Sequence, residues 1–364
     1  MAVYSPSQLT QYLNHISHPP IPSSAPRDLS LLSSLQTRQL CTIPFESLSL
    51  HYSPTRLISL SPHALFAKMV TNPAGRRGGY CMENNALFGC VLRGFGYEVL
   101  SVGGRVSHET TGRRDGGWDG WNHMVNLVRV EGRRYLVDVG FGGDGPCFPI
   151  PLERRGEGGV VFEGVAPQEL RLEWKSLPKH TDPEQRVWVY SHRENRIARW
   201  VEAYCFTEVE FFAEDFAIMN MSTMTLRESY FVQTVLAQRF VLEEELVEEG
   251  DLEDQANIGQ GTSGGTNDGE NRPRAVGVMI LHKDLVKRRM ADKVEVLTVL
   301  ESEADRAAAL KKYFSIELGE EELRAIRDLP TELRGDGGSA GGENTDRVQR
   351  GFKVNGARKI EEKV

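Results

Sequence analysis

The stretch RRGGYCMENN, residues 76–85, places a cysteine directly after two glycines and a tyrosine and follows it with an acid and two asparagines. From Cys81 to residue 96 the apolar residues recur at helical spacing, which predicts a helix that begins at this cysteine. A helix N-terminus stabilises a thiolate because its N–H groups are unpaired and its dipole is positive there. Gly78 and Gly79 would let the backbone turn sharply and approach a substrate closely. This context favours Cys81 as a nucleophile, and an inert packed thiol is the alternative.

The other cysteines, at positions 41, 90, 147 and 205, are expected to be small buried residues. Five cysteines are an odd number, and the sequence contains no CxxC pair. We therefore expect neither a disulfide framework nor a metal site.

The composition is that of a globular protein, with 364 residues, 40% of them hydrophobic and 26% charged. A chain of this length has room for two or three compact units. The net charge of −8 opposes non-specific binding to nucleic acid or anionic lipid. The sequence has no long apolar run, and its N-terminus lacks a charged-then-apolar leader. We predict a cytoplasmic protein that binds neither nucleic acid nor membranes.

Three regions with different patterns follow one another, which predicts an α+β fold. Residues 1–97 carry helical patterns that start at Ser or Asp N-caps, and they predict a helical bundle. Residues 98–215 carry short β-branched and aromatic runs between glycine-rich turns, which are typical of an antiparallel barrel or sandwich. Residues 216–364 mix both patterns. Within them, 250–274 is predicted to be a disordered insertion and 334–347 a mobile glycine-rich segment.

The third region begins with an ambiguous boundary. EVEFFAEDFAIMNM, residues 208–221, favours the start of a helix. Strands are expected within residues 230–242, 275–290 and 293–300, and a last helix over EADRAAALKKYF, residues 303–314.

His123 is the candidate base for Cys81, because it opens the apolar strand HMVNLVRV, which a short turn joins to RRYLVDVGFGG. If residues 131–132 form a two-residue hairpin turn, His123 and Asp138 share one face as diagonal neighbours. Their backbones then lie roughly 7 to 8 Å apart, which the side chains can bridge. A three-residue turn would put the two side chains on opposite faces.

The neighbours of Asp138, YLV before it and VGF after it, predict that its carboxylate points into a protected space. A buried carboxylate needs a partner, and the hairpin register supplies His123. The alternatives are a solvent-facing strand charge at 138 and an ordinary polar strand start at 123.

RRGGYCMENN, HMVNLV and YLVDVGFGG, with the upstream IPFESLSLH, resemble the signature segments of the arylamine N-acetyltransferases. The order Cys, His, Asp and the 15-residue separation of His123 and Asp138 also resemble that family. The likeness covers residues 1–215 and continues more loosely into YFSIEL. It implies a helical bundle, an antiparallel β-barrel and an α/β lid around a papain-like Cys-His-Asp core. Cys81 would be the acyl-accepting nucleophile, His123 its base and Asp138 the residue that orients the base.

The resemblance also implies supporting residues around this core. Phe45, Val106 and Phe141 would line the acceptor pocket, and core packing is the alternative for each. Glu46 and Arg77 would form a structural ion pair that supports the cysteine loop, and a surface pair is the alternative.

Gly142 and Gly143, in the glycine-rich GFGGDGP, are implied to lie near the coenzyme A pyrophosphate. Backbone N–H groups of such a loop can cradle phosphate. A plain tight turn explains the same residues.

The implied activity is ping-pong transfer of an acetyl group from acetyl-coenzyme A, through a Cys81 thioester, to an arylamine, hydrazine or N-hydroxyarylamine, as in xenobiotic metabolism. Malonyl-coenzyme A is an alternative donor. Arg105, Arg113 or Arg114 could pair with its carboxylate, and a solvated surface role is the alternative for each. A papain- or transglutaminase-like cysteine hydrolase and a non-catalytic binding module are competing hypotheses for the whole protein. The hydrolase should turn over peptides or amides without coenzyme A, and the binding module should form no acyl adduct.

Overall fold

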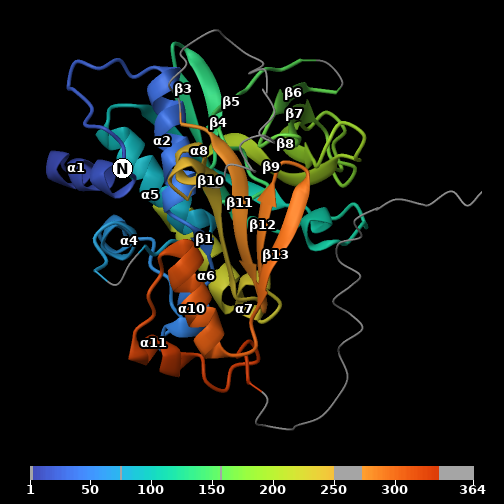
Figure 1. The fold of residues 1–364 in the computed structure, drawn as a ribbon. Coiled ribbons are helices and arrows are strands. Elements are labelled where there is room, and N and C mark those ends of the chain that lie inside the picture. The colour runs from blue at the N-terminus through green and yellow to red at the C-terminus, as the bar shows by residue number, and fades with distance from the viewer. Residues whose placement is uncertain (1–2, 74–75, 156–157, 250–272, 336–364) are drawn as a thin grey trace, which may run out of the picture.

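A computed structural model (Figure 1) describes the chain over four ranges, residues 3–73, 76–155, 158–249 and 273–335. Apart from their ends, the predicted insertion (250–274) and the predicted glycine-rich segment (334–347) lie outside the described residues. Within the described ranges, no helix is both long and apolar enough to cross a lipid bilayer.

The first region is mainly helical, as predicted. Its helices are α1 (Pro6–His15), α2 (Leu29–Thr42), α3 (Ser49–Tyr52), α4 (Pro62–Met69) and α5 (Cys81–Gly94). Ser5 and Asp28 cap α1 and α2, since their side chains accept N–H groups of the first turn. The short strand β1 (Phe45–Glu46) was not predicted, because it takes its structure from pairing with the third region and not from a local pattern.

The second region forms one antiparallel sheet that curls without closing. In spatial order its strands are β5 (Ile150–Pro151), β4 (Arg133–Val137), β3 (His123–Val130), β2 (Glu98–Val106), β9 (Val201–Glu210), β8 (Val187–Arg193), β7 (Glu169–Lys175) and β6 (Val160–Glu163). A 3₁₀ helix, η1 (His108–Thr111), follows β2. Among the described residues β5 and β6 do not pair with each other, so the predicted barrel is a half-barrel. Its strands share one apolar cluster, which includes Val125, Trp188 and Phe206, and burial of this cluster keeps the sheet curled.

Strand β9 corrects the prediction for residues 208–221. The first three of these residues belong to β9, where Glu210 pairs with Val102 of β2. Helix α6 (Ala213–Thr225) begins only after them. The sequence EVEFF is compatible with either a helix or a strand, and pairing with β2 makes its first three residues a strand.

The hairpin of β3 and β4 has the predicted register, because residues 126–130 pair with residues 133–137 across a two-residue turn. Glu131 and Gly132 have φ angles of 48° and 78°, the pattern of a type I′ turn. Asp138 follows the last paired residue of β4 directly, so the register of the hairpin places it.

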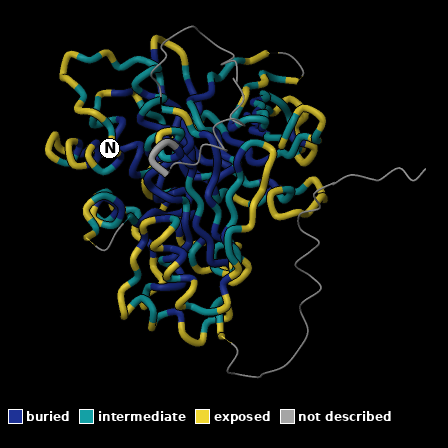
Figure 2. The backbone as a smooth tube through the Cα atoms, in the orientation of Figure 1, coloured by how far each residue is buried: buried dark blue, intermediate teal, exposed yellow. Residues whose placement is uncertain are grey.

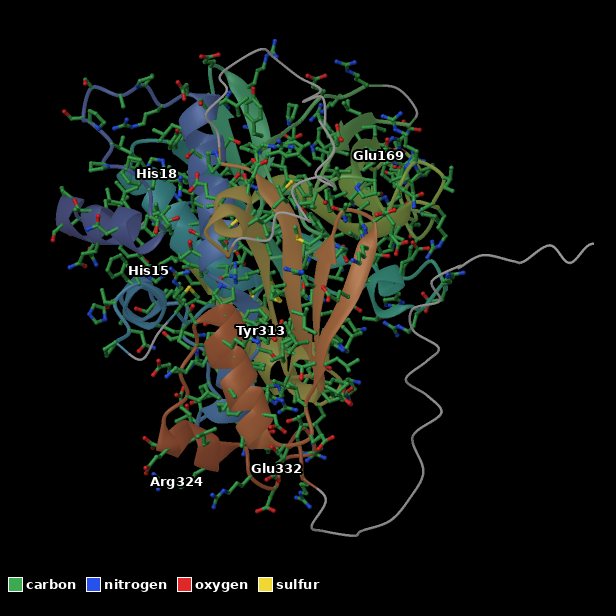
Figure 3. The ribbon with its side chains drawn as sticks, viewed as in Figure 1. His15, His18, Glu169, Tyr313, Arg324 and Glu332 are labelled. Atoms are coloured by element: carbon green, nitrogen blue, oxygen red, sulfur yellow. The ribbon has the colours of Figure 1, made fainter. Side chains whose placement is uncertain are left out.

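The third region contains a second antiparallel sheet, the lid sheet. Its strands lie in the order β1, β10 (Leu236–Leu242), β11 (Ala275–His282), β12 (Leu285–Met290) and β13 (Lys293–Val299). Its further helices are α7 (Tyr230–Gln233), α8 (Glu243–Glu249), α10 (Glu303–Phe314) and α11 (Glu320–Ala325). Arg239 of β10 donates to the carbonyl of Tyr313 at 3.0 Å, which ties α10 to the sheet. Tyr313 is labelled on α10 in Figure 3. The predicted strand at 230–242 is a helix over its first four residues, and the other predicted strands and the helix at 303–314 are confirmed. That helix is not the last one, because the short helix α11 follows it.

Helix α5 lies where the three regions meet. Most of its residues are buried, as are those of β3, and Figure 2 shows this buried backbone at the centre of the molecule. One apolar cluster contains Leu35 of α2, Leu87 of α5, Val137 of β4 and Phe240 of β10. Burial of each such side chain contributes about 1.5 to 3 kcal/mol. The first residue of α5 is therefore held by packing along the whole helix.

Replacing Glu131 by Asn should stabilise the hairpin turn. Asn adopts positive φ at lower cost than Glu, and Asn-Gly is the favoured pair in a type I′ turn. We expect the free energy of unfolding, measured in urea by circular dichroism, to rise by about 0.5 kcal/mol. Glu131→Val is the matched control and should lower it by about 1 kcal/mol, since a β-branched residue is strained at positive φ. The opposite order of the two variants would contradict this turn type.

Candidate active site

Cys81 is the first residue of α5 and is 3% exposed. Its Sγ lies 3.5 Å from the carbonyl oxygen of Asn122. Glu83, in the first turn, accepts the N–H of Tyr80 at 3.2 Å, so a side chain caps the turn that precedes the cysteine. Cys81 thus stands at the helix N-terminus that the sequence predicted.

His123 and Asp138 form a buried pair. The Nε2 of His123 donates to Oδ2 of Asp138 at 2.8 Å, and the two side chains are 1% and 0% exposed. This contact confirms the meeting predicted from the hairpin register. Because Nε2 is used by the carboxylate, Nδ1 is the ring nitrogen left to face the sulfur.

Two close contacts bring this pair to the helix. A Cβ at Gly140 would lie 2.6 Å from Cα of Cys81, so glycine is required for the loop after β4 to approach α5 this closely. Asn85, one turn after Cys81, donates to Oδ1 of Asp138 at 2.8 Å and accepts the N–H of Val139 at 3.0 Å. These contacts bring Cys81 close to His123, which lies 42 positions later in the sequence.

Burial disfavours the charged forms of His123 and Asp138, but the attraction between the two charges outweighs this effect of burial. Burial lowers the pKa of His123, whereas Asp138 and a hydrogen bond with the Cys81 side chain raise it, and the resulting pKa is about 10. Burial raises the pKa of Asp138, whereas His123, Asn85 and the N–H of Gly140 lower it, and it ends below its ordinary value. The pair is therefore an imidazolium and a carboxylate at neutral pH.

Two of the three predicted pocket residues lie beside Cys81 and His123. Phe45 is half-buried in an apolar cluster that contains Cys81, and its ring centre lies 5.8 Å from that of Phe231. Phe141 is half-buried with its ring centre 5.4 Å from the imidazole of His123. Aromatic side chains therefore flank both the thiol and the imidazole.

Val106, the third predicted pocket residue, ends β2 and is half-buried. Its N–H donates to Oδ1 of Asn122 at 3.0 Å, which places it beside the residue whose carbonyl contacts the thiol. The neighbouring Trp121 packs in the cluster of Cys81, and the guanidinium of Arg105 lies 4.0 Å above its ring. Arg105 thus reaches the wall of this cluster.

The glycine-rich loop packs against β10 of the lid sheet. Gly142 has φ 79°, and a Cβ there would lie 2.5 Å from Oε1 of Gln238. The N–H of Gly143 donates to this same oxygen at 2.7 Å, and the N–H of Gly145 donates to the carbonyl of Gly142 at 3.0 Å. The N–H groups of residues 143 and 145 are thus engaged within the protein, as in a tight turn.

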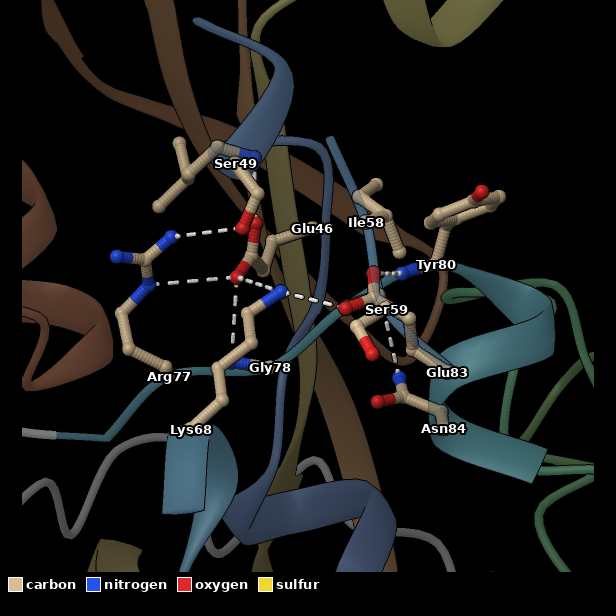
Figure 4. A network of polar contacts seen from close by, with 12 residues as sticks. Glu46, Ser49, Ile58, Ser59, Lys68, Arg77, Gly78, Tyr80, Glu83 and Asn84 are labelled. Carbon is tan, nitrogen blue, oxygen red and sulfur yellow. Dashed lines mark hydrogen bonds and ion pairs between the residues drawn. The ribbon is translucent and has the colours of Figure 1, made fainter. Parts of the chain in front are cut away.

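A buried network of charges, shown in Figure 4, supports the loop before the cysteine. Glu46 accepts from Nε of Arg77 at 3.4 Å, which confirms the predicted ion pair, and from the N–H of Gly78 at 3.3 Å. The Nζ of Lys68 lies 3.7 Å from Glu46 and 2.7 Å from Glu83. Burial raises the pKa of Glu46, but Lys68 and Arg77 outweigh this effect and lower it.

Comparison with known proteins places the chain in a family. The sequence model of a family described as N-acetyltransferase matches residues 28–250, more than half of the chain. The N-malonyltransferase FDB2 of Fusarium pseudograminearum (strain CS3096) is 32% identical over 357 residues, which cover 91% of this chain and 94% of that protein. The chain belongs to the arylamine N-acetyltransferase family.

Other members of the arylamine N-acetyltransferase family match in sequence or in structure. The arylamine N-acetyltransferase of Mycolicibacterium smegmatis is 43% identical over 157 residues, which cover 43% of this chain and 51% of that protein. The solved structure of Mycobacterium marinum arylamine N-acetyltransferase in complex with CoA has 25% identity and a TM-score of 0.63, and the match covers 87% of this chain and 98% of that one. The half-barrel and the lid sheet therefore have the arrangement of this family.

Two residues near the site, Asn85 and Phe231, were not singled out from the sequence. Asn85 could have been found, because it follows Cys81 by four residues and must share its helix face. Phe231 could not, because it lies in α7, within a segment whose pattern predicts a strand.

The pair of His123 and Asp138 should make the protein less stable as the pH rises above neutrality. The folded pKa of His123, about 10, exceeds the unfolded value of about 6.5, so its contribution is complete below about 6.5 and is lost towards 10. Asp138 has a lowered pKa, so its contribution is present above its unfolded pKa and is lost as the pH falls through the folded value. In Asp138→Asn, burial should keep His123 neutral, so the stability of this variant should not fall as the pH rises above neutrality.

Urea unfolding at intervals between about pH 6 and pH 10 measures this difference. The wild-type free energy of unfolding should fall with a slope of up to about 1.4 kcal/mol per pH unit, and Asp138→Asn should lack this component. Glu317→Gln, at an exposed pair with Lys311 at 3.0 Å, should keep the wild-type slope. Equal slopes in wild type and Asp138→Asn would refute the charged pair.

Proposed function

We propose that the protein is an acyl-coenzyme A-dependent N-acyltransferase in which Cys81 carries the acyl group as a thioester. The proposal rests on three neighbouring groups: the sulfur of Cys81 at a helix N-terminus, the imidazolium of His123 and the carboxylate of Asp138. Membership of the family supports the same reaction. A cytoplasmic location stays a prediction.

In the proposed reaction Cys81 reacts as a thiolate that is paired with the imidazolium of His123, and this thiolate attacks the thioester carbonyl of the donor. Backbone N–H groups at the start of α5, including that of Cys81, stabilise the oxyanion. The bond from the acyl carbon to the coenzyme A sulfur breaks, coenzyme A leaves with the proton of His123, and acyl-Cys81 remains. The amine then attacks acyl-Cys81, His123 accepts the amine proton, and the thiolate of Cys81 leaves. The kinetics are ping-pong, and Asp138 keeps His123 in the orientation that both steps need.

The proposed acceptors are arylamines, hydrazines and N-hydroxyarylamines. Phe45, Phe141 and Phe231 offer half-buried aromatic faces that suit a flat acceptor ring. The same side chains and Val106 limit the access of water, which favours transfer to an amine over hydrolysis.

The proposed donor is malonyl-coenzyme A, with acetyl-coenzyme A as the second candidate. The sequence motifs imply an acetyl donor first, as the family name does. However, the relative named N-malonyltransferase matches along 91% of the chain, whereas the acetyltransferase of M. smegmatis matches along 43%. The longer match includes the lid sheet, whereas the motifs around Cys81 lie outside this sheet except for Phe45 and Glu46.

Gly142 and Gly143 are proposed to border the coenzyme A moiety. The M. marinum structure was solved in complex with CoA, which supports coenzyme A as a ligand of the fold. To take the N–H of Gly143, a phosphate would displace Oε1 of Gln238. The side chain of Gln238 would then be free to donate to the same phosphate through its amide.

Incubation with malonyl-coenzyme A or acetyl-coenzyme A should place one acyl group on Cys81, and an added arylamine should remove it. Peptide mapping by mass spectrometry locates the adduct. Cys81→Ala should form none, while Cys90→Ala, the control on the same helix, should keep it. Asp138→Asn should fold and lose roughly 10³- to 10⁴-fold in kcat/KM, because His123 loses its orientation. An enzyme that turns over peptides or amides without coenzyme A, or that forms no adduct with either donor, would rule out the proposal.

The preference for malonyl over acetyl should depend on Arg105. Its guanidinium is proposed to pair with the malonyl carboxylate, because it already lies over the ring of Trp121, which packs against the apolar cluster that contains Cys81. Arg105→Gln should lower kcat/KM about tenfold for malonyl-coenzyme A and change it less than about twofold for acetyl-coenzyme A.

Arg113→Gln is the matched control, since Arg113 is 57% exposed and lies 3.8 Å from Asp119 at the surface. It should leave both donors unaffected. Equal losses for the two donors in Arg105→Gln would remove Arg105 from donor selection.

A further inference from the structure

Glu83 has two contacts with opposite consequences for Cys81. Its Oε2 accepts the N–H of Tyr80 at 3.2 Å and so fixes the turn that precedes the nucleophile (Figure 4). The same carboxylate is a negative charge in the first turn of α5, two residues after Cys81, and Glu83 is only 2% exposed. Water screens such a charge poorly, so its field would oppose a thiolate at Cys81.

The second glycine of the motif provides the space for this carboxylate. A Cβ at Gly79 would lie 2.4 Å from Oε2 of Glu83. The first glycine serves another contact, since a Cβ at Gly78 would lie 1.8 Å from the carbonyl oxygen of Pro44. The carboxylate is therefore an integral part of the cysteine loop, and its charge must be balanced.

Lys68 supplies the balancing charge from a neighbouring helix. Its Nζ lies 2.7 Å from Oε1 of Glu83 and 3.7 Å from Glu46, and its side chain is 20% exposed. Burial holds the pKa of Glu83 above its ordinary value, and Glu46 adds to this effect, whereas Lys68 and the N–H of Tyr80 oppose it. Glu46 is paired with Arg77 at 3.4 Å, and Arg77 also contacts Glu322 of α11 at 2.6 Å. Lys68 is thus the cation whose ion pair opposes protonation of Glu83 within its cap.

Helix α4 holds Lys68 in this place. Leu65, Phe66 and Met69 of α4 are buried in the same apolar cluster as the residues of α5. Lys68 stands in the last turn of α4, where a cation is also favoured by the helix dipole. The ammonium group therefore cannot leave Glu83 without breaking the packing of its own helix or a charge-assisted hydrogen bond.

We propose that Lys68 is a positioning residue for acyl transfer: it lets Glu83 cap the turn at Tyr80 as a carboxylate while it cancels the negative charge that Glu83 would present to Cys81. The inference rests on the proposed function, because it concerns Cys81 as a thiolate nucleophile. Lys68 acts through Glu83 and touches no reacting atom.

The rate at which iodoacetamide alkylates Cys81, followed against pH on the full chain with peptide mapping, tests this role. The readout is the pH at which this rate reaches half of its maximum. Alkylation needs no coenzyme A and no amine, so a failure of this inference and a failure of the proposed acyl transfer are distinguishable.

Glu83→Gln keeps an acceptor for the N–H of Tyr80 and removes the negative charge at position 83, so Lys68 keeps the more distant Glu46, at 3.7 Å, as its carboxylate partner. The half-rate pH should fall by about one unit. Adding Lys68→Gln in this background, where no carboxyl at position 83 can take up a proton instead, should return it to within about 0.3 unit of the wild type. Adding Lys68→Arg should leave it low.

A role that is only structural would lower the melting temperature or the maximal rate and would not move the half-rate pH down and then back. Lys311→Gln, at an exposed pair with Glu317, is the control for the loss of a lysine and should match the wild type. If Glu83→Gln alone does not fold, the two double variants still differ by the charge at position 68, and the arginine variant should have the lower value by about one unit. An unchanged half-rate pH in Glu83→Gln, or equal values in the two double variants, would overturn the inference.

Discussion

The backbone of Gly140 rests on the first turn of α5, and the geometry of the site depends on this contact. A single methylene at position 140 would overlap Cα of Cys81. Because the contact is made between backbones, it fixes the hairpin of β3 and β4 relative to the helix without a flexible side chain between them. Asn85 can then reach Asp138, and Asp138 can hold His123, each at 2.8 Å. A larger separation would leave the carboxylate buried with fewer partners, which is costly.

Charged side chains lie in the interior on both sides of Cys81, and each is held by more than one contact. His123 and Asp138 lie on the side of the half-barrel, while Glu46, Arg77, Lys68 and Glu83 lie under the preceding loop. An unpaired ion in such a place costs several kcal/mol, so the partners are restricted to a narrow range of positions. This restriction keeps the imidazole of His123 and the N-terminus of α5 in one relative orientation, as the proposed acyl transfer requires.

The lid sheet takes part in the site through two small elements. Strand β1 comes from the helical region but pairs with β10, and its Phe45 packs against the apolar cluster that contains Cys81. Gln238, opposite Phe45 on β10, receives the N–H of Gly143. The walls of the proposed pocket thus belong to all three regions of the chain, and a change in the lid sheet would reshape that pocket without touching Cys81, His123 or Asp138.

Local signals in the sequence were sufficient for the helix start at Cys81, the register that joins His123 to Asp138, and the division into helical, β and mixed regions. These features depend on caps, turn types and periodicity, which act over a few residues. The open edge of the half-barrel, the full length of β9 and the strand β1 were decided only by pairing with distant segments. The meeting of Cys81 with His123, the contact at Gly140 and the balance of Glu83 by Lys68 likewise required the tertiary structure, because they join residues whose separation in sequence carries no information about their separation in space.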